Sequence, residues 1–214
     1  MVLRLAEELE VPLRERNVLL ISAGYAPVFP QRSFDDPALA DGRRVTETLL
    51  TAHAPVPALA VDRHWSLVSA NPPVQALLAG VAPALLERPA NVLRISFHPD
   101  GLARRIVNLR QWRGHVFGRL RRQIDVSADP VLAGLLEELQ DLAGSDADEQ
   151  DDAAANGDIA VPFRLSTEAG ILDFITTTTI FGTPVDVTLS EIAIESFFPA
   201  NPETAAALHR LAGG

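Results

Sequence analysis

The sequence predicts an α+β protein whose core is a five-stranded antiparallel sheet with helices packed on one face. Three observations lead to this prediction. Runs rich in apolar and β-branched residues fall into two groups, at residues 57–70 and 159–198. Four pairs of Asp or Asn followed by Pro mark helix starts, and a long amphipathic segment separates the two groups of strands. A chain of 214 residues is long enough for one good core with an appendage.

Two of the five strands form a predicted hairpin at residues 57–61 and 66–70, with Asp62 to His64 at its bend. The other three are predicted at residues 159–166, 171–180 and 185–198, linked by the turn sequences TEAG and FGTP. The threonine-rich run ITTTTI suits the middle strand of these three, because β-branched side chains pack well on a pleated surface.

Each Asx-Pro pair has the chemistry of a helix N-terminus. The side-chain oxygen of the first residue accepts a hydrogen bond from an orphan amide of the first turn, and the proline has no amide hydrogen to leave unpaired. The pairs are Asp36-Pro37, Asn71-Pro72, Asp129-Pro130 and Asn201-Pro202. Together with apolar periodicity they predict helices at residues 2–10, 13–23, 37–52, 72–79, 102–124, 130–143 and 202–212.

The predicted helix at residues 102–124 has one apolar stripe, formed by Leu102, Ile106, Leu109, Trp112, Val116, Leu120 and Ile124. Arg113 projects into this stripe, where an unpaired guanidinium would cost several kcal/mol. Two explanations remain open. The first is an internal ion pair with Glu191 or Glu195, or a side chain that reaches out to solvent, and the second is an anchor for a ligand carboxylate. His115 projects away from the stripe and is expected to be exposed.

The composition excludes several classes of function. There is no cysteine, so disulfides, thiolate metal sites and cysteine nucleophiles are absent. A net charge of −10 argues against a broad nucleic-acid surface on this chain. The start MVLRLAEELE does not resemble a signal peptide, and no apolar run is long enough to span a membrane, so a cytoplasmic location is expected. Residues 144–157 are small and acidic, which predicts a mobile loop, or alternatively an acidic tether that occupies the basic helix.

An enzyme is not expected. The five histidines show neither HxH nor HExxH spacing, which argues against a histidine metal site. There is no GxSxG elbow and no glycine-rich loop for a phosphate, so no cofactor is predicted. Asp62 and His64 are better explained by the hairpin bend than as a catalytic pair.

Four blocks of sequence resemble one known family. They are LAEELEVPLRERNVLLISAGYAPVF, PALAVDRHWSLVSAN, NVLRISFHPDGLARRIVNLRQWRGHVFGRLRRQ and TTTTIFGTPVDVTLSEIAIESFFPAN. In this order and at this spacing they resemble the MmyB-like family of XRE-type helix-turn-helix transcriptional regulators, which have a PAS-like ligand-binding domain. The resemblance implies a PAS-like fold, a role in gene regulation and a homodimer. It also implies an apolar cavity for a small, fatty-acyl-like effector.

The resemblance implies a division into four parts. Residues 1–27 resemble only the last two helices of the DNA-binding domain. Two explanations are open, a truncated form or a natural protein that has lost its DNA-reading helices, and the first is favoured. In either case DNA is expected to be bound only through N-terminal helices that are missing here. Residues 28–53 are then a connecting helix, residues 54–200 the PAS-like ligand-binding domain, and residues 201–214 a C-terminal helix.

The apolar residues that face each other across the predicted helix and sheet are candidates for the cavity wall. With Arg113 as a possible anchor, they are Trp112, Val116 and Leu120 on the helix and Phe163, Phe174 and Ile194 on the strands. The alternative is that these are plain core residues. The competing function is a protein-interaction module that dimerises without a small ligand, using Phe197 and Phe198 on an exposed face of the sheet.

Overall fold

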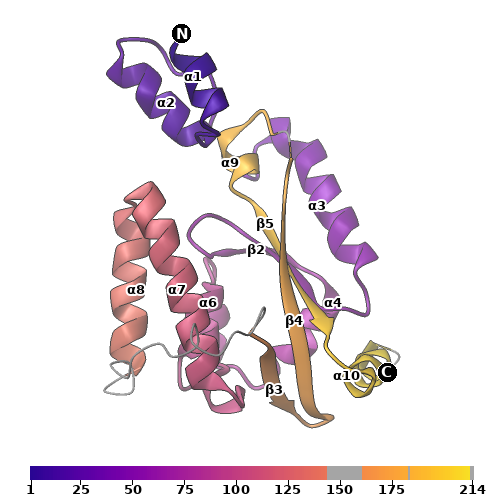
Figure 1. Cartoon of the computed structure of the whole chain (residues 1–214). Helices are drawn as coiled ribbons and strands as arrows, with labels where there is room; N and C mark the ends of the chain where they lie inside the picture. Colours follow the sequence, from indigo (N-terminus) through magenta and orange to yellow (C-terminus); the bar gives the residue numbers. More distant parts are fainter. Residues whose placement is uncertain (144–160, 183, 213–214) are drawn as a thin grey trace.

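The computed structural model describes residues 1–143, 161–182 and 184–212. Its centre is a five-stranded sheet in which neighbouring strands are all antiparallel (Figure 1). The two groups of strands join where the first strand of the hairpin pairs with the last strand of the chain. The predicted α+β fold is therefore confirmed. In the order β2-β1-β5-β4-β3, the strands are β2 (Leu67–Ala70), β1 (Ala58–Val61), β5 (Ala193–Pro199), β4 (Gly170–Ile180) and β3 (Phe163–Thr167).

The helices agree with the prediction at both ends of the chain. The helices predicted at 130–143 and 202–212 have these bounds in the structure, whereas three short helices, α5, α6 and α9, were not predicted. The α-helices are α1 (Val2–Glu8), α2 (Leu13–Ser22), α3 (Ala40–Ala52), α4 (Pro72–Leu77), α5 (Pro83–Leu86), α6 (Val92–Phe97), α7 (Leu109–Ser127), α8 (Pro130–Ala143), α9 (Val187–Ser190) and α10 (Pro202–Ala212), with 3-10 turns η1 (Pro37–Leu39) and η2 (Ala103–Arg105).

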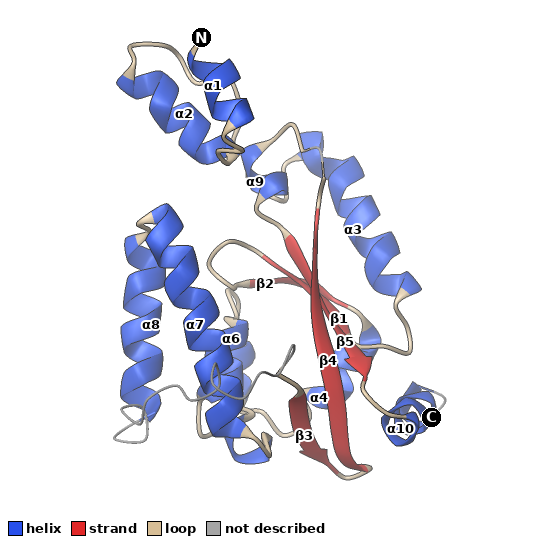
Figure 2. Ribbon diagram, in the orientation of Figure 1, coloured by secondary structure: helices blue, strands red, loops and turns tan. Residues whose placement is uncertain are grey.

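The side chains of β1 alternate between two cores, as they must along a strand that is covered on both faces. Leu59 and Val61 join the larger core, which packs against α4, α6, α7 and α8. Ala58 and Ala60 form a smaller core with Leu50 of α3. Figure 2 shows α7 and α8 on one side of the strands and α3 on the other. Most helices thus share one face, and α3 adds a layer on the opposite face.

The helix predicted at residues 102–124 is interrupted, and α7 begins only at Leu109. Between η2 and α7, Ile106 is extended and forms a β-bridge with Leu165, and Val107 and Asn108 form a turn. The amide of Val107 donates to the Arg164 carbonyl oxygen at 2.9 Å. A continuous helix would withdraw these backbone groups from the edge of β3, which explains why the apolar periodicity alone placed the helix start too early.

The strand predicted at residues 185–198 is wrong in its first half, where α9 forms. Asp186 caps this helix, because its carboxylate accepts the amide of Thr188 at 2.9 Å. The same carboxylate, which is almost fully buried, pairs with Arg32 at 2.8 Å. The predicted strand at 159–166 also starts later, at Phe163; residues 159 and 160 lie outside the described residues.

Three of the four Asx-Pro pairs form the predicted cap, in which the side chain accepts an amide of the next turn at 2.8 Å. Asn71 does not cap α4. Its Oδ1 accepts the Ala58 amide at 3.0 Å, and its Nδ2 donates to the carbonyl oxygens of Leu50 and Val56. This buried amide therefore joins the end of α3 to the start of β1.

Helices α1 and α2 lie beyond one end of the sheet, next to α9 (Figure 1). Asn17 of α2 accepts the amides of Val28 and Phe29 at 3.1 Å, which holds the following segment against the helix. The domain boundaries at residues 27, 53 and 200 stay a prediction. The acidic mobile loop predicted at 144–157 lies outside the described residues. Within the described ranges, no helix has the length and hydropathy that a bilayer crossing requires.

Candidate functional site

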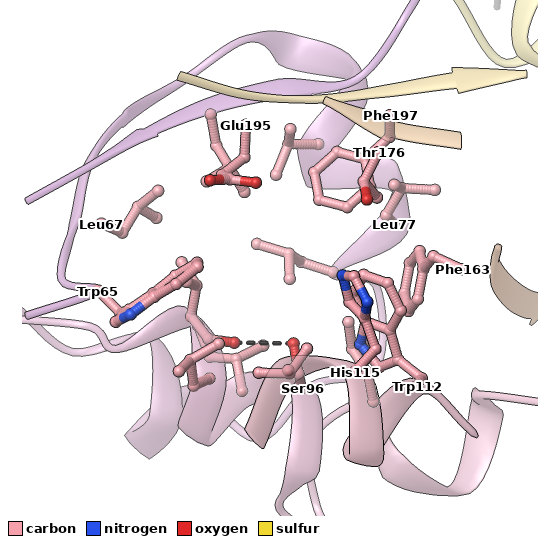
Figure 3. A pocket seen from close by; sticks show the side chains of 18 of the residues that line it. Trp65, Leu67, Leu77, Ser96, Trp112, His115, Phe163, Thr176, Glu195 and Phe197 are labelled. Atoms are coloured by element: carbon pink, nitrogen blue, oxygen red, sulfur yellow. Dashed lines mark hydrogen bonds between the residues drawn. The ribbon is translucent and has the colours of Figure 1, made fainter. Parts of the chain in front are cut away.

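A cavity of about 90 Å³ lies inside the larger core, between the sheet and helices α6 and α7 (Figure 3). Side chains from the strands, the β1–β2 turn and the helices line this space without filling it. The wall is mainly apolar, made by Leu59, Trp65, Leu67, Val74, Leu77, Leu78, Val92, Leu93, Ile95, Leu102, Trp112, Val116, Phe163 and Phe197.

Five polar side chains also line the cavity, and two of them form an ion pair. Arg119 of α7 donates to both carboxylate oxygens of Glu195 of β5, at 2.7 and 3.2 Å. Glu195 also accepts the hydroxyl of Thr178 at 3.0 Å, and only 8% of its side chain is exposed. The pair is thus neutral as a unit and well hydrogen-bonded, which is what a buried charge requires. The other polar lining residues are Ser96, His115 and Thr176.

Aromatic rings form the wall at one end of the cavity. Trp112 lies between Phe163, at 4.9 Å between ring centroids, and His115, which stacks on it at 5.5 Å. The indole Nε1 of Trp112 is buried and has no hydrogen-bond partner among the described residues. A buried N–H without an acceptor is uncommon in folded proteins and calls for an explanation.

Trp65 forms the opposite end of the cavity (Figure 3). It sits in the β1–β2 turn with a positive φ of 65°, and Asp62 stabilises this turn by accepting the amides of His64 and Ser66. The Trp65 indole donates to Gln123 at 2.9 Å, and the guanidinium of Arg119 lies 4.5 Å from the centroid of its ring. These contacts fix an indole in a backbone conformation that side chains rarely adopt.

The residues just before Trp65 belong to a group of charges that we call the charged junction, formed by Arg14, Arg63, His64, Asp129 and Glu191. Arg14 of α2 makes a bidentate pair with Glu191, at 2.6 and 2.8 Å. Arg63 contacts Glu191 at 3.5 Å and also pairs with Asp129 at the start of α8. His64 Nε2 lies 3.0 Å from the same Asp129 oxygen.

Contacts within the charged junction shift the pKa values of two of its residues, Asp129 and Arg14. Burial disfavours the charged form of Asp129, but the hydrogen bond with His64, the Val131 amide and the charge of Arg63 outweigh burial and lower the pKa of Asp129 to about 2. The hydrogen bond to Glu191 raises the pKa of Arg14 above its ordinary value. Both shifts favour the charged forms of Asp129 and Arg14.

The predicted site residues are only partly brought together. Trp112, Val116 and Phe163 line the cavity. Leu120 and Phe174 are fully buried in the same core but are not among the lining residues. Ile194 belongs to the smaller core on the opposite face, because its neighbours in β5 point to the cavity and side chains alternate along a strand.

Arg113 is half-buried on α7 and does not line the cavity. The two carboxylates proposed as its partners are engaged by other arginines, Glu195 by Arg119 and Glu191 by Arg14 and Arg63. Its role as a ligand anchor stays a prediction.

Sequence reasoning missed Trp65, His115, Arg119 and Glu195. His115 was expected to be exposed, yet it stacks on Trp112 and lines the cavity, because the wall continues round α7 beyond the apolar stripe. The period-2 pattern of β5 was a usable signal for Glu195, since it puts this residue on the same face as Phe197. Phe197 faces the cavity as well. Of the two phenylalanines expected on an exposed face of the sheet, Phe198 is therefore the one that is exposed.

No group of three or more His, Asp or Glu side chains that could hold a metal ion occurs within residues 1–143, 161–182 and 184–212. The cavity wall, mainly apolar with five polar side chains, has the composition typical of small-molecule sites.

Comparison with known proteins identifies the chain at the level of a family. None of the curated proteins matches it. The family described as MmyB-like transcription regulator ligand binding domain matches residues 43–211, which is more than half of the chain and includes every residue that lines the cavity. This is a family of regulator domains and not an enzyme family, and the resemblance stated from the sequence is confirmed. The chain belongs to the MmyB-like transcription regulators and carries their ligand-binding domain.

Proposed function

We propose that this protein senses a small apolar molecule bound in the cavity beneath α7 and that binding controls the DNA-binding part of the regulator. The observation that carries the proposal is a cavity with mainly apolar walls inside the larger hydrophobic core. Packed interiors contain few voids larger than a water molecule, so a cavity with mainly aliphatic and aromatic walls favours an apolar guest.

The volume limits the size of that guest. An engineered apolar cavity of about 150 Å³ holds benzene, and the cavity here measures about 90 Å³. A fatty-acyl chain suits the walls, but only its first carbons fit unless α7 moves away from the sheet. Each further buried methylene contributes about 0.8 kcal/mol, which gives a long chain the free energy to widen the cavity.

The charged junction supplies a route from the cavity to α2. Trp65 lines the cavity, and Arg63 and His64 in the same turn contact Asp129 and Glu191. Glu191 in turn holds Arg14 of α2. We propose that a guest that displaces the Trp65 ring changes the position of this turn and, through Glu191, of the N-terminal helices.

Calorimetric titration with straight-chain carboxylic acids of increasing length tests the binding step. We expect the affinity of the unmodified protein to rise about fourfold for each methylene, corresponding to about 0.8 kcal/mol, until the cavity is full. Val116→Phe places a ring in the cavity and should remove binding. Val126→Phe makes the same change at an exposed position of α7 and should leave it unchanged.

Two results would contradict this function. One is that no chain length binds, and the other is that Val116→Phe binds as well as the unmodified protein. Thermal unfolding of Val116→Phe checks that the variant is folded, and Ser96→Leu, which also adds bulk to the cavity, repeats the test from α6.

An exposed apolar strip favours a second function, dimerisation through the sheet. The strip lies on the face of the sheet that α3 packs against, beyond the part that α3 covers. Ile175 and Phe198 are cross-strand partners there, with 45% and 39% of their surface exposed. We expect Ile175→Arg to convert a dimer to a monomer in analytical ultracentrifugation, and Val126→Arg on α7 to have no effect. A wild-type chain that sediments as a monomer at all concentrations removes this function.

A further inference from the structure

We infer that the molecule bound in the cavity carries a hydroxyl group, which donates to the Glu195 carboxylate and accepts a hydrogen bond from Thr176. Thr176 is then a residue that determines specificity. This inference rests on the proposed binding of an apolar molecule and adds one polar group to it. A hydroxylated acyl chain satisfies both proposals.

The first part of the argument is the hydroxyl of Thr176, which lies on β4 at the sheet side of the cavity. It makes no hydrogen bond with any of the described residues, whereas the Ser96 hydroxyl on α6 already donates to the Val92 carbonyl oxygen at 2.8 Å. The Ser196 hydroxyl, on the other face of the sheet, also has no partner among these residues but is fully buried. The Thr176 oxygen keeps accessible surface, and Figure 3 shows it directed into the cavity. A bound molecule can therefore reach it.

The second part is an unused acceptor on the neighbouring strand. A carboxylate offers about four lone-pair sites for hydrogen bonds. Among the described residues, Glu195 of β5 uses three of them, two for Arg119 and one for the Thr178 hydroxyl. Its side chain lines the cavity, is 8% exposed and points toward the same space (Figure 3). The carboxylate can therefore accept one more hydrogen bond from a guest without giving up its pair with Arg119.

The register of the sheet brings these two groups together. Thr178 is the direct cross-strand partner of Glu195, and Thr176 is that of Phe197, so Thr176 is a diagonal neighbour of Glu195 on the same face. Diagonal neighbours are about 7–8 Å apart along the backbone, which leaves space for one oxygen atom between their side chains. A carboxylate only accepts, while a threonine hydroxyl also donates, so the single group that completes both is a second hydroxyl. A ketone oxygen has no proton for Glu195.

Three probes with the same carbon skeleton test the inference. Ethylbenzene has no polar group, acetophenone has an oxygen that only accepts, and 1-phenylethanol has a hydroxyl. Binding of each probe to the full chain is measured by calorimetry. For each variant, the affinity for 1-phenylethanol is divided by the affinity for ethylbenzene, so that a general change in the cavity cancels.

Substitutions at position 176 isolate one hydroxyl group. Thr176→Val replaces it by a methyl group of nearly the same shape, and Thr176→Ser keeps the hydroxyl and removes the methyl group. Thr177→Val is the matched control, because Thr177 is exposed on the opposite face of the same strand. Thermal unfolding checks that each variant is folded.

We expect Thr176→Val to lower the affinity ratio about five- to tenfold, the size of one net hydrogen bond. Thr176→Ser and Thr177→Val should leave the ratio within about twofold of the unmodified protein, because both keep the Thr176 position able to donate. In the unmodified protein, 1-phenylethanol should bind more tightly than acetophenone, since only the alcohol donates to Glu195.

The outcomes separate the inference from the proposed function. If the probes bind but Thr176→Val leaves the ratio unchanged, Thr176 does not hold the guest, while apolar binding stands. If acetophenone binds as tightly as 1-phenylethanol, the polar group is only an acceptor and the hydroxyl class is wrong. If Thr176→Ser loses as much as Thr176→Val, packing and not the hydroxyl determines the ratio. If no probe binds and straight-chain acids also fail, the proposed function itself is wrong.

Discussion

The cavity and the charged junction are neighbours in the fold, yet they are built from opposite chemistry. The cavity has mainly apolar walls and one neutral ion pair, and it leaves space in the core. The charged junction consists of ion pairs and hydrogen bonds between charged side chains. Arg14, Arg63, His64, Asp129 and Glu191 reach one another from four parts of the chain through paired contacts.

This difference bears on the β1–β2 turn, which contributes residues to both the cavity and the charged junction. Apolar contacts are non-directional, so a cavity adapts to guests of different shape. Bidentate charge pairs are directional and hold one geometry. Arg63, His64 and Trp65 are consecutive, so the turn connects an adaptable region to a region of fixed geometry. The following predictions test whether the two regions differ in this way.

The largest effect is expected at Gly101, which supports the cavity wall between Ile95 and Leu102. A Cβ at this position would lie 2.1 Å from the Ile95 carbonyl oxygen, which is a backbone atom and cannot move aside cheaply. We expect Gly101→Ala to lower the free energy of unfolding by more than about 3 kcal/mol, as for strongly overpacked sites. Urea denaturation followed by circular dichroism measures this.

Gly134 on α8 is the matched control for that substitution. A Cβ there meets no atom within 4 Å, and alanine is the better helix former. Gly134→Ala should therefore raise the free energy of unfolding by about 0.5–1 kcal/mol. Equal effects at the two glycines would show that the cavity wall is not held by close backbone contact.

The next largest loss in the free energy of unfolding is expected in the charged junction. Arg63→Ala leaves Asp129, whose side chain is 6% exposed, with His64 as its remaining side-chain partner at the junction, and we expect a loss of about 3 kcal/mol. The control is Arg44→Ala, which breaks a pair with Asp41 in which both side chains are mostly exposed, and which should cost less than about 0.5 kcal/mol. Chemical denaturation of both variants gives the comparison, and similar costs would place the junction among ordinary surface pairs.

The pH dependence of stability offers a smaller but more specific test. The pKa of Asp129 falls from an ordinary 3.8 to about 2 in the folded protein. Its contribution of about 2 kcal/mol is therefore complete above pH 4 and is lost as the pH falls from about 4 toward 2. The difference in unfolding free energy between the unmodified protein and Asp129→Asn should shrink over this range. A difference that stays constant from pH 6 to pH 3 would contradict the assignment.

The smallest effect is expected within the cavity. Thr176→Val replaces a hydroxyl by a methyl group of nearly the same shape at the wall. We expect a change of less than about 1 kcal/mol in stability and a modest gain in affinity for ethylbenzene, since the wall is mainly apolar. Calorimetry with ethylbenzene checks this, and a loss of affinity of tenfold or more would show that the hydroxyl holds the guest.

The strands, most helix starts and the family were predictable because they depend on local patterns. The Asx-Pro pairs and the alternation of apolar residues need no knowledge of distant neighbours. The interruption before α7 was not predictable in the same way. It depends on the edge of β3, which lies more than 50 residues later in the chain, accepting the backbone of Ile106 and Val107.

The cavity could be predicted only in part for the same reason. Trp112 and Val116 follow from the apolar stripe of one helix. Trp65 could not be found in this way, since an indole at a hairpin bend with positive φ looks like a turn residue until α7 packs over it. Ile194 was misplaced because the sheet has a second covered face, and its neighbour Glu195 is the residue that lines the cavity.

Trp65 and Trp112 are the only two tryptophans of the chain, and both form walls of the same cavity. The tryptophan fluorescence of the protein, excited selectively over Tyr25, therefore originates from the two ends of that space. One indole is hydrogen-bonded and lies under a guanidinium, while the other lies among rings, so their emission should differ in colour. The protein thus contains an optical reporter of its own occupancy, which allows ligands to be screened without attaching a dye.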